Sequence, residues 1–432
     1  MGRTGARAHS SLRGRDLGAA RGRCLHRAGR QGMEAPVAMG RTQNPPDLRA
    51  GAARRVDIQA IEQELAFFWE LAGAPEAGHG PVTTARVLNL IAVTARPADS
   101  ARVQQTLSGL IYRYPCRAIL VLAEVDAPEP GLEAWIQAHC QLPDPSGVQV
   151  CCEQISLQAR GAALRDAGAL VLPLLVPDLP VSLWWLGEPP GSRPRAPAQP
   201  TAEPPGERLL AELFGRLLSV SDQLIVDSAA FAGPGQGLRW LAARCDQAAG
   251  RYHVADLAWA RLAPWRTLLA QCFDPPEARA CLTRIERIEL EHAPGPDGQV
   301  EAVLLVAWLA SRLGWEPGAA PQQGAARLSL RAGPRTVAVE LYSRGQAGPT
   351  AGAVRRVALY AGGAHFAVRL TEPSCAAVEA VLESRSQPAR VLRLPPANEA
   401  ELLARLLDTL GGDPVYEAAL MLAAQLSEAA GI

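Results

Sequence analysis

One apolar stretch constrains the fold of this chain more than any other feature of its sequence. From Ala169 to Leu186 the sequence is interrupted only by three prolines and two polar residues. A strand that is apolar on both faces is expected where a sheet is covered on both sides. A second strand is predicted at 150–159, and a helix that begins near Ala162 separates it from the strand predicted at 181–186. The stretch therefore predicts the centre of an α/β sheet.

Two adjacent tryptophans lie within the predicted central strand. Because side chains alternate along a strand, Trp184 and Trp185 are expected to point to opposite faces of the sheet. Each ring can bury about 150–250 Å² of surface, so the pair would anchor the layers on both sides. Core packing is the expected role of both residues.

Strands and helices alternate along the first two thirds of the chain. The segments 85–95, 98–112 and 115–125 are predicted to be strand, helix and strand, a βαβ unit with parallel strands and a right-handed crossover. The segments 133–142 and 148–159 are predicted to form an antiparallel hairpin. The next elements are helix 207–218, strand 222–228, helix 238–249, strand 254–259 and helix 264–273. This alternation predicts a mostly parallel sheet with helices on both faces.

Strands dominate the last third of the chain. The predicted elements are a charged strand at 281–291, a helix at 300–313, strands at 327–331, 336–343, 354–360 and 365–370, and two terminal helices separated by Gly411 and Gly412. We therefore predict a disordered basic leader at 1–55, an α/β domain at 56–275 and a smaller α+β domain at 276–432. A flexible loop is expected at 187–207, where seven of 21 residues are proline.

The basic charge of the chain is concentrated in the leader. The formal net charge is zero, but residues 1–55 hold 12 arginines and three acidic residues, which gives +9. A segment of this composition is predicted to be disordered. It can mimic a transit peptide, and a basic arm can bind nucleic acid. The favoured interpretation is a dispensable leader, with Met33 or Met39 as the true first residue and no nucleic-acid partner. An amphipathic helix is predicted at 57–71.

Cysteine usage and hydropathy favour the cytoplasm. Nine cysteines are scattered over 432 residues without the density of a disulfide scaffold, and their number is odd. This usage is typical of a protein in a reducing compartment. No window of 18 apolar residues is free of both charge and proline, so no membrane span is predicted.

The predicted hairpin contains residues that could bind a metal, but a metal site is the less favoured interpretation of them. His139, Cys140, Cys151 and Cys152 are residue types that zinc prefers. If the turn centres near Pro145, His139 lies opposite Cys151. Neighbouring strand residues face opposite ways, so at most these two share a face, and the CxxC spacing of strong zinc sites is missing. No metal is predicted.

A nucleotide cofactor is not predicted either. Gly233, Gly235 and Gly237 follow a predicted strand and precede a helix, and Asp256 lies 19 residues further on. The spacing is GxGxG, with Leu238 where a dinucleotide site requires its third glycine. Asp256 is predicted to begin its strand, whereas a ribose-binding acid ends one. The chain also lacks lysine and the GxSxG, HExxH and GxxxxGK[ST] motifs, so the sequence offers no catalytic set.

The segment DLAWARLAPWR, 256–266, has the composition of a binding site. It concentrates Asp256, Trp259, Arg261, Trp265 and Arg266 between a predicted strand and a predicted helix. Tryptophan and arginine are common interface anchors, and a helix start favours anions. We therefore predict partner binding at these five residues. The alternative is that Asp256 pairs with an arginine and the tryptophans pack in the core.

Four segments carry a resemblance to a known family. They are VCCEQISLQA, LVLPLLVPDLPVSLWW, SDQLIVDSAAF and DLAWARLAPWRTLLAQCFD, which resemble, in this order, the bacterial glucose-6-phosphate dehydrogenase assembly proteins, the OpcA family. The resemblance implies a cytoplasmic protein of the pentose phosphate pathway that has no chemistry of its own. Such a protein binds glucose-6-phosphate dehydrogenase, promotes its active oligomer and thereby acts as an allosteric activator.

One alternative function from another class stays open at this point. It is an enzyme or sensor that binds a sugar phosphate or a nucleotide, near 233–237 or 261–266. Under the favoured interpretation, replacing Arg261 and Arg266 together by alanine weakens activation of the enzyme at least tenfold without unfolding the chain. Under the structural interpretation, the same replacement unfolds it.

Overall fold

A computed structural model describes most of the chain beyond the leader. The described residues are 54–55, 61–63, 65–66, 82–110, 113–140, 149–193, 204–319, 327–344, 353–372, 374–382, 385–386, 389–394 and 396–430. Nearly all of the predicted leader, most of the predicted helix at 57–71 and the middle of the proline-rich loop lie outside them. None of the helices in the described part is long and apolar enough to cross a membrane.

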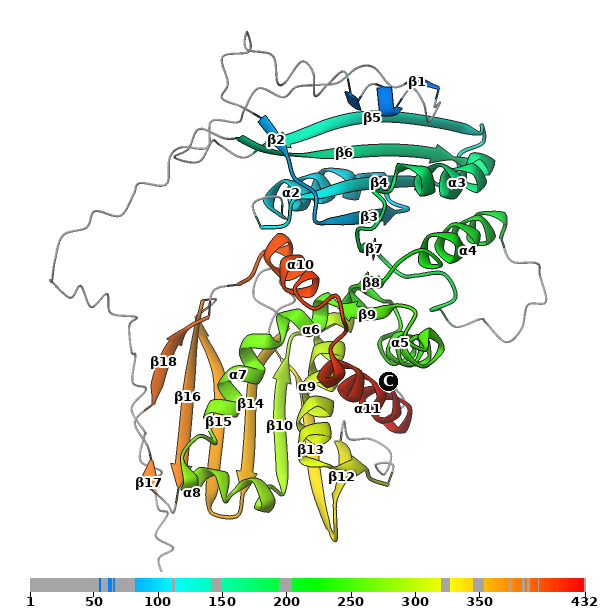
Figure 1. Ribbon diagram of the computed structural model, residues 1–432. Coiled ribbons are helices and arrows are strands. Elements are labelled where there is room, and N and C mark those ends of the chain that lie inside the picture. The colour runs from blue at the N-terminus through cyan, green and yellow to red at the C-terminus, as the bar shows by residue number, and fades with distance from the viewer. Residues whose placement is uncertain are drawn as a thin grey trace, which may run out of the picture. The chain divides into compact units, whose positions relative to one another are not determined.

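The first sheet has nine strands and confirms the predicted α/β architecture (Figure 1). Its order is β1-β5-β6-β4-β3-β7-β8-β9, with β2 paired to β6. The strands are β1 (Arg54–Arg55), β2 (Val82–Thr84), β3 (Leu88–Thr94), β4 (Cys116–Glu124), β5 (Gly131–Cys140), β6 (Gln149–Arg160), β7 (Val181–Trp185), β8 (Gln223–Val226) and β9 (His253–Asp256). The path from β6 to β9 is parallel throughout, whereas β5 pairs with β6 and β1 with β5 in antiparallel fashion.

The predicted central strand is an interior strand. β7 pairs with β3 on one side and with β8 on the other. All five of its residues are buried. Trp184 and Trp185 belong to two separate apolar clusters, as their predicted orientation toward opposite faces requires.

Helices cover both faces of the first sheet. The helices of the described chain are α2 (Ser100–Leu110), α3 (Leu164–Leu174), α4 (Pro205–Leu218), α5 (Pro234–Ala248), α6 (Leu257–Arg261), α7 (Ala263–Gln271), α8 (Pro276–Arg279), α9 (Pro296–Leu313), α10 (Glu399–Leu407) and α11 (Pro414–Ala430). One apolar cluster contains Trp184 with side chains from α2, α6 and α10. The other contains Trp185 with side chains from α3, α4 and α5, and it continues into the second sheet.

The second sheet also has nine strands and is mostly antiparallel. Its order is β11-β12-β13-β10-β14-β15-β16-β17, with β18 paired to β16. The strands are β10 (Arg287–His292), β11 (Glu316–Pro317), β12 (Arg327–Ala332), β13 (Arg335–Ser343), β14 (Val354–Ala361), β15 (Ala364–Glu372), β16 (Cys375–Leu382), β17 (Arg385–Ser386) and β18 (Arg390–Arg393). β10 lies in the interior, parallel to β13 and antiparallel to β14, and its residues alternate between half-buried and buried.

The last two helices connect the second sheet to the first. α10 packs on α2 and α6, and α11 packs on α5 and α9. The capping box between Asn398 and Glu401 begins α10, and Asp413 caps the first turn of α11 just after Gly412. All of the described residues belong to one compact unit, so the domain division predicted at 275 and 276 stays a prediction.

Three parts of the sequence prediction differ from the structure. The strand predicted at 281–291 begins only at Arg287, because a short 3-10 helix, Leu282–Arg284, precedes it. The strand predicted at 254–259 ends at Asp256, because the Asp256 carboxylate caps a helix, α6, that begins at the next residue. The strands β16, β17 and β18 are absent from the sequence prediction. Ala, Glu and Leu in β16 favour a helix, and only its valines favour a strand, so pairing with β15 decides the structure of this segment.

Candidate functional site

The five residues predicted to bind a partner lie around the turn that joins β9 to α6 and α7. Asp256 is the last residue of β9, Trp259 and Arg261 are on α6, and Trp265 and Arg266 are on α7. Asp256, Trp259 and Trp265 are each no more than 3% exposed, and the two arginines are half-buried. The structure therefore places both tryptophans in the core, as the structural alternative expected.

Asp256 is fully buried and fully hydrogen-bonded. Its carboxylate accepts hydrogen bonds from the backbone N–H groups of Ala258 (2.9 Å) and Ser228 (3.0 Å), and from the hydroxyls of Ser228 (2.5 Å) and Tyr416 (3.3 Å). Burial raises the pKa of Asp256 to about 6, and the nearby Asp227 carboxylate adds to the rise, while the bonds from Ser228 and Ala258 oppose it. The carboxylate thus joins the ends of β8 and β9 to α11, and it pairs with none of the described arginines.

The position of Asp256 corrects one part of the sequence argument. Asp256 ends its strand, where a ribose-binding acid would lie. Its side chain is nevertheless 0% exposed and its oxygens are occupied by chain groups. Gly237 also has a packing role, because a Cβ at this position would lie 2.3 Å from a ring carbon of Phe231.

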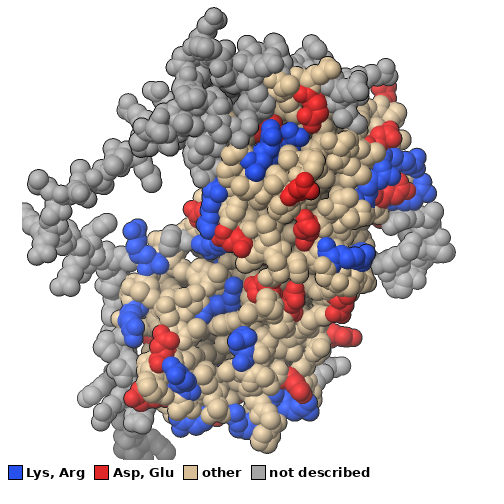
Figure 2. Space-filling model, in the orientation of Figure 1, with Lys and Arg blue, Asp and Glu red and all other residues tan. Residues whose placement is uncertain are grey.

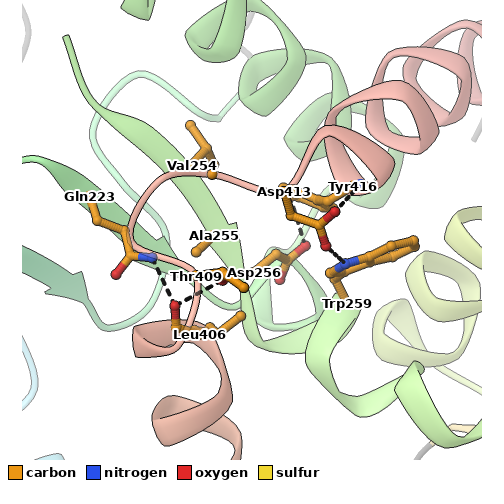
Figure 3. Close-up of a pocket in the computed structure, with 10 residues that line it drawn as sticks. Gln223, Val254, Ala255, Asp256, Trp259, Leu406, Thr409, Asp413 and Tyr416 are labelled. Atoms are coloured by element: carbon orange, nitrogen blue, oxygen red, sulfur yellow. Dashed lines mark hydrogen bonds between the residues drawn. The ribbon is translucent and has the colours of Figure 1, made fainter. Parts of the chain in front are cut away.

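Trp259 is held between an aspartate, a tyrosine and an arginine. Its indole N–H donates to Asp413 at 2.8 Å, and its ring centroid lies 5.5 Å from that of Tyr416 (Figure 3). The Arg266 guanidinium lies 3.4 Å from the centroid of the indole and donates to the Trp259 carbonyl at 2.7 Å. Burial lowers the pKa of Arg266 to about 10, although Asp413 acts in the opposite direction. The stacked arginine therefore joins α7 to Trp259 of α6.

Arg261 joins the turn after β8 of the first sheet to α9, which lies next to the second sheet. Its guanidinium donates to both oxygens of Asp227, at 2.6 and 3.0 Å, and to Glu301 of α9 at 2.7 Å. Burial alone would lower the pKa of Arg261, but the two carboxylates raise it above its ordinary value. Burial raises the pKa of Glu301, which also accepts a hydrogen bond from the Ala353 backbone at 2.8 Å. This network ties α6, α9 and the turn after β8 together.

A small hollow lies beside these residues. It is lined by Gln223, Val254, Ala255, Asp256, Trp259, Leu406, Thr409, Gly412, Asp413 and Tyr416, and its volume is about 20 Å³ (Figure 3). A volume of this size holds about one water molecule. The hollow is too small for a sugar phosphate or a nucleotide.

The described side chains form no cluster of three or more His, Cys, Asp or Glu placed to hold a metal. The hairpin register also differs by one from the prediction: His139 lies opposite Cys152, and Cys140 lies opposite Cys151. The midpoint of the observed pairs lies half a residue later in the chain than Pro145, the midpoint on which the prediction rests. Cys152 is a buried free thiol, while Cys151 is disulfide-bonded.

Sequence reasoning missed the partners of the predicted residues. Asp227, Glu301, Asp413 and Tyr416 complete the network, and they lie 34, 40, 154 and 160 residues from the side chains that they contact. A local signal existed only for Asp413, because Asp413 and Pro414 predict the start of the last helix. No signal in the sequence pairs the other three with the predicted site.

Two sequence models of one family match the chain. The first describes the N-terminal domain of a glucose-6-phosphate dehydrogenase subunit and matches 109–243; the second describes the C-terminal domain of the same subunit and matches 252–420. Together they account for well over half of the chain. The chain belongs to the OpcA family.

Curated relatives agree with this assignment. The chain is 36% identical over 204 residues to a protein of Synechocystis sp. and 34% identical over 206 residues to one of Nostoc punctiforme, both provisionally named OxPP cycle protein OpcA. These matches cover 47 and 48% of the chain, and 38 and 39% of the relatives. The chain therefore matches less than half of the length of these relatives.

Solved structures give a weaker comparison. The transcriptional regulator Gal80p of Kluyveromyces lactis aligns with a TM-score of 0.44 and 9% identity, over 83% of this chain and 95% of that one. An oxidoreductase structure from Parabacteroides merdae aligns with a TM-score of 0.44, also at 9% identity, over 82% of this chain and 99% of that one. Scores this low carry no conclusion about function.

Proposed function

We propose that this protein is a non-catalytic partner of glucose-6-phosphate dehydrogenase, which binds the enzyme and promotes its active oligomer. The observation that carries the proposal is the match to both domains of the glucose-6-phosphate dehydrogenase subunit family, over 109–243 and 252–420. The names of the relatives place those proteins in the oxidative pentose phosphate cycle. We extend that pathway to this chain as part of the proposal.

The chemistry of the candidate site supports a binding role. Asp256, Arg261 and Glu301 have shifted pKa values, and shifted values are a common mark of catalytic residues. Here each of the three is engaged by other groups of the chain, and the adjacent hollow holds about one water. The arrangement stabilises a junction between α6, α9 and α11. It offers no room for a sugar phosphate, which counts against the alternative function at this place.

The partner-binding role of the five predicted residues stays a prediction, in a modified form. Trp259 and Trp265 are 3% exposed, so they would act by holding α6 and α7 in place. Of the five, only the half-buried Arg261 and Arg266 reach the surface. We also propose a cytoplasmic location. The six free thiols of the described part support this location, because thiols stay reduced there, whereas the disulfide at Cys151 does not support it.

Light scattering of the purified protein mixed with its cognate glucose-6-phosphate dehydrogenase tests the proposal. The expected result is a species heavier than either component alone, with the enzyme in a higher oligomeric state than in the absence of this protein. Unchanged masses at micromolar concentrations of both would contradict it.

A further inference from the structure

The edge of the second sheet exposes an apolar strand. β18, Arg390–Arg393, pairs with β16 on one side, and no described residue pairs with its other side. All four of its residues are exposed. The described chain has five exposed large hydrophobic residues, and two of them are neighbours here: Val391 at 45% and Leu392 at 37%. An apolar edge strand of this kind is a ready template for another strand.

The hydrogen-bond register shows which backbone groups the edge offers. The N–H of Leu394 donates to the Ser374 carbonyl at 2.6 Å, so Leu394 belongs to a hydrogen-bonded pair. In an antiparallel ladder such pairs alternate with pairs that face outward. The N–H and C=O groups of Val391 and Arg393 therefore point away from β16. No described residue pairs with these groups, so within the described chain they are available to a further strand.

The charge at this edge selects the kind of strand that fits. The segment 385–393, which forms β17 and β18, contains three arginines and no acidic residue. Figure 2 shows basic side chains near the lower-left margin, beside the place where Figure 1 labels β18, with acidic side chains among them. Because side chains alternate along a strand, Arg390 and Leu392 lie on one face of the sheet, and Val391 and Arg393 lie on the other. An incoming strand with acidic residues opposite Arg390 and Arg393 and two apolar residues between them would pair its acids with both arginines and cover Val391 and Leu392.

We infer that β18 is a docking edge that takes up an acidic, extended segment of a partner protein by adding it as a further strand of the sheet. In this mode the main chain supplies hydrogen bonds and alternate side chains supply specificity. The inference rests on the proposed function, because the partner in question is glucose-6-phosphate dehydrogenase. It deepens that function by placing the contact on the second sheet, away from the junction of α6 and α7.

A different role of the arginines is protection of the edge. Natural proteins blunt exposed edges with charged residues and proline, and Pro388 lies just before β18. Protection alone, however, does not account for two adjacent aliphatic side chains at the centre of the strand. The two interpretations differ in what happens when the outward N–H of Val391 is removed.

Val391→Pro is the discriminating variant. Proline removes the outward N–H of this residue and leaves the bonds of β18 to β16 in place, and an edge strand tolerates proline in this orientation. Arg390→Glu with Arg393→Glu reverses the charge of the edge and keeps every backbone group. Arg312→Glu with Arg405→Glu, at exposed positions on α9 and α10, is the control with the same change of net charge.

The experiment measures the affinity of each variant for the cognate glucose-6-phosphate dehydrogenase by titration calorimetry, with the melting temperature of each variant as a check of folding. We expect Val391→Pro and the β18 charge reversal each to weaken binding at least tenfold, with melting temperatures within about 2 °C of wild type. The α9 and α10 reversal should bind nearly as wild type. If Val391→Pro lowers the melting temperature by several degrees, the charge-reversal pair and its control decide the question.

Three results would overturn the inference. Wild-type affinity in both β18 variants would show that the edge is only protected, and the proposed function would stand. Loss of self-association in Val391→Pro, with enzyme binding unchanged, would show that the edge pairs with a second copy of this chain. No binding of the enzyme by the wild-type protein at micromolar concentrations would reject the proposed function and this inference together.

Discussion

The removal of Arg261 tests whether the candidate site holds the fold together. The sequence predicts that Arg261 and Arg266 can be replaced without unfolding, whereas the structure places Arg261 between Asp227 and the buried Glu301. Arg261→Met keeps most of the aliphatic stem and removes the charge. Among the described residues, Glu301 would then keep a single hydrogen-bond donor, the backbone N–H of Ala353.

The burial of the two carboxylates sets the size of the effect. The Glu301 side chain is 3% exposed, while that of Asp227 is 27% exposed and can turn to water. Removing one partner of a buried ion pair costs about 3–5 kcal/mol, because the other charge is left without compensation. With one backbone donor retained at Glu301, we expect a loss of about 3 kcal/mol in the free energy of unfolding. For a unit of this size, that loss corresponds to a fall in melting temperature of roughly 4 °C.

A second substitution and the pH dependence identify the cause. Glu301→Gln in the same chain removes the stranded charge and keeps an acceptor for Ala353, so the double variant should lose less than Arg261→Met alone. Burial raises the folded-state pKa of Glu301 above its unfolded value, and the loss of Arg261 raises it further. An acid of this kind destabilises the fold as the pH rises from its unfolded-state pKa to its folded-state pKa. Arg261→Met should therefore regain stability on acidification, and the double variant should not.

Thermal unfolding between pH 4 and pH 8 measures these effects. A melting temperature for Arg261→Met within 2 °C of wild type at neutral pH would refute the reasoning. So would a double variant that is no more stable than the single one. Either result would return Arg261 to the surface role that the sequence predicts.

Two further predictions concern the neighbouring aspartates. Burial raises the folded-state pKa of Asp256 to about 6, so this group lowers the free energy of unfolding as the pH rises from about 4 to 6. Urea unfolding of Asp256→Asn should therefore show a weaker pH dependence in that interval than the wild type. An unchanged pH dependence would contradict a raised pKa for Asp256. Asp413→Ala should cost about 2 kcal/mol, because α11 loses a cap and the Trp259 N–H loses its acceptor. Asp413→Asn, which keeps the cap, should cost less by urea unfolding followed through tryptophan fluorescence.

The centre of the first sheet could be predicted because its signal is local. A run that is apolar on both faces identifies β7. The alternation of charged and apolar residues identifies β10, although the predicted strand begins six residues too early. The two terminal helices follow from the glycine pair at 411–412 and the Asp–Pro that starts α11. In each case the residues that decide the structure are neighbours in the chain.

The candidate site could be predicted only in part, because its contacts are not local. The segment 256–266 contains four members of the junction, but the partners that bury them come from the turn after β8, from α9 and from α11. Tryptophan and arginine are common both at interfaces and in stacked, buried pairs, so their presence alone does not separate the two. The exposed strand β18 was invisible for a similar reason, since its strand character depends on pairing with β16.

The activity of the cognate glucose-6-phosphate dehydrogenase, measured as increasing amounts of this protein are added, tests the central claim most directly. The account predicts that this protein alone forms no NADPH from glucose 6-phosphate, and that it raises the rate of the enzyme until the enzyme is saturated. A rate that does not change at micromolar concentrations of this protein would contradict the account.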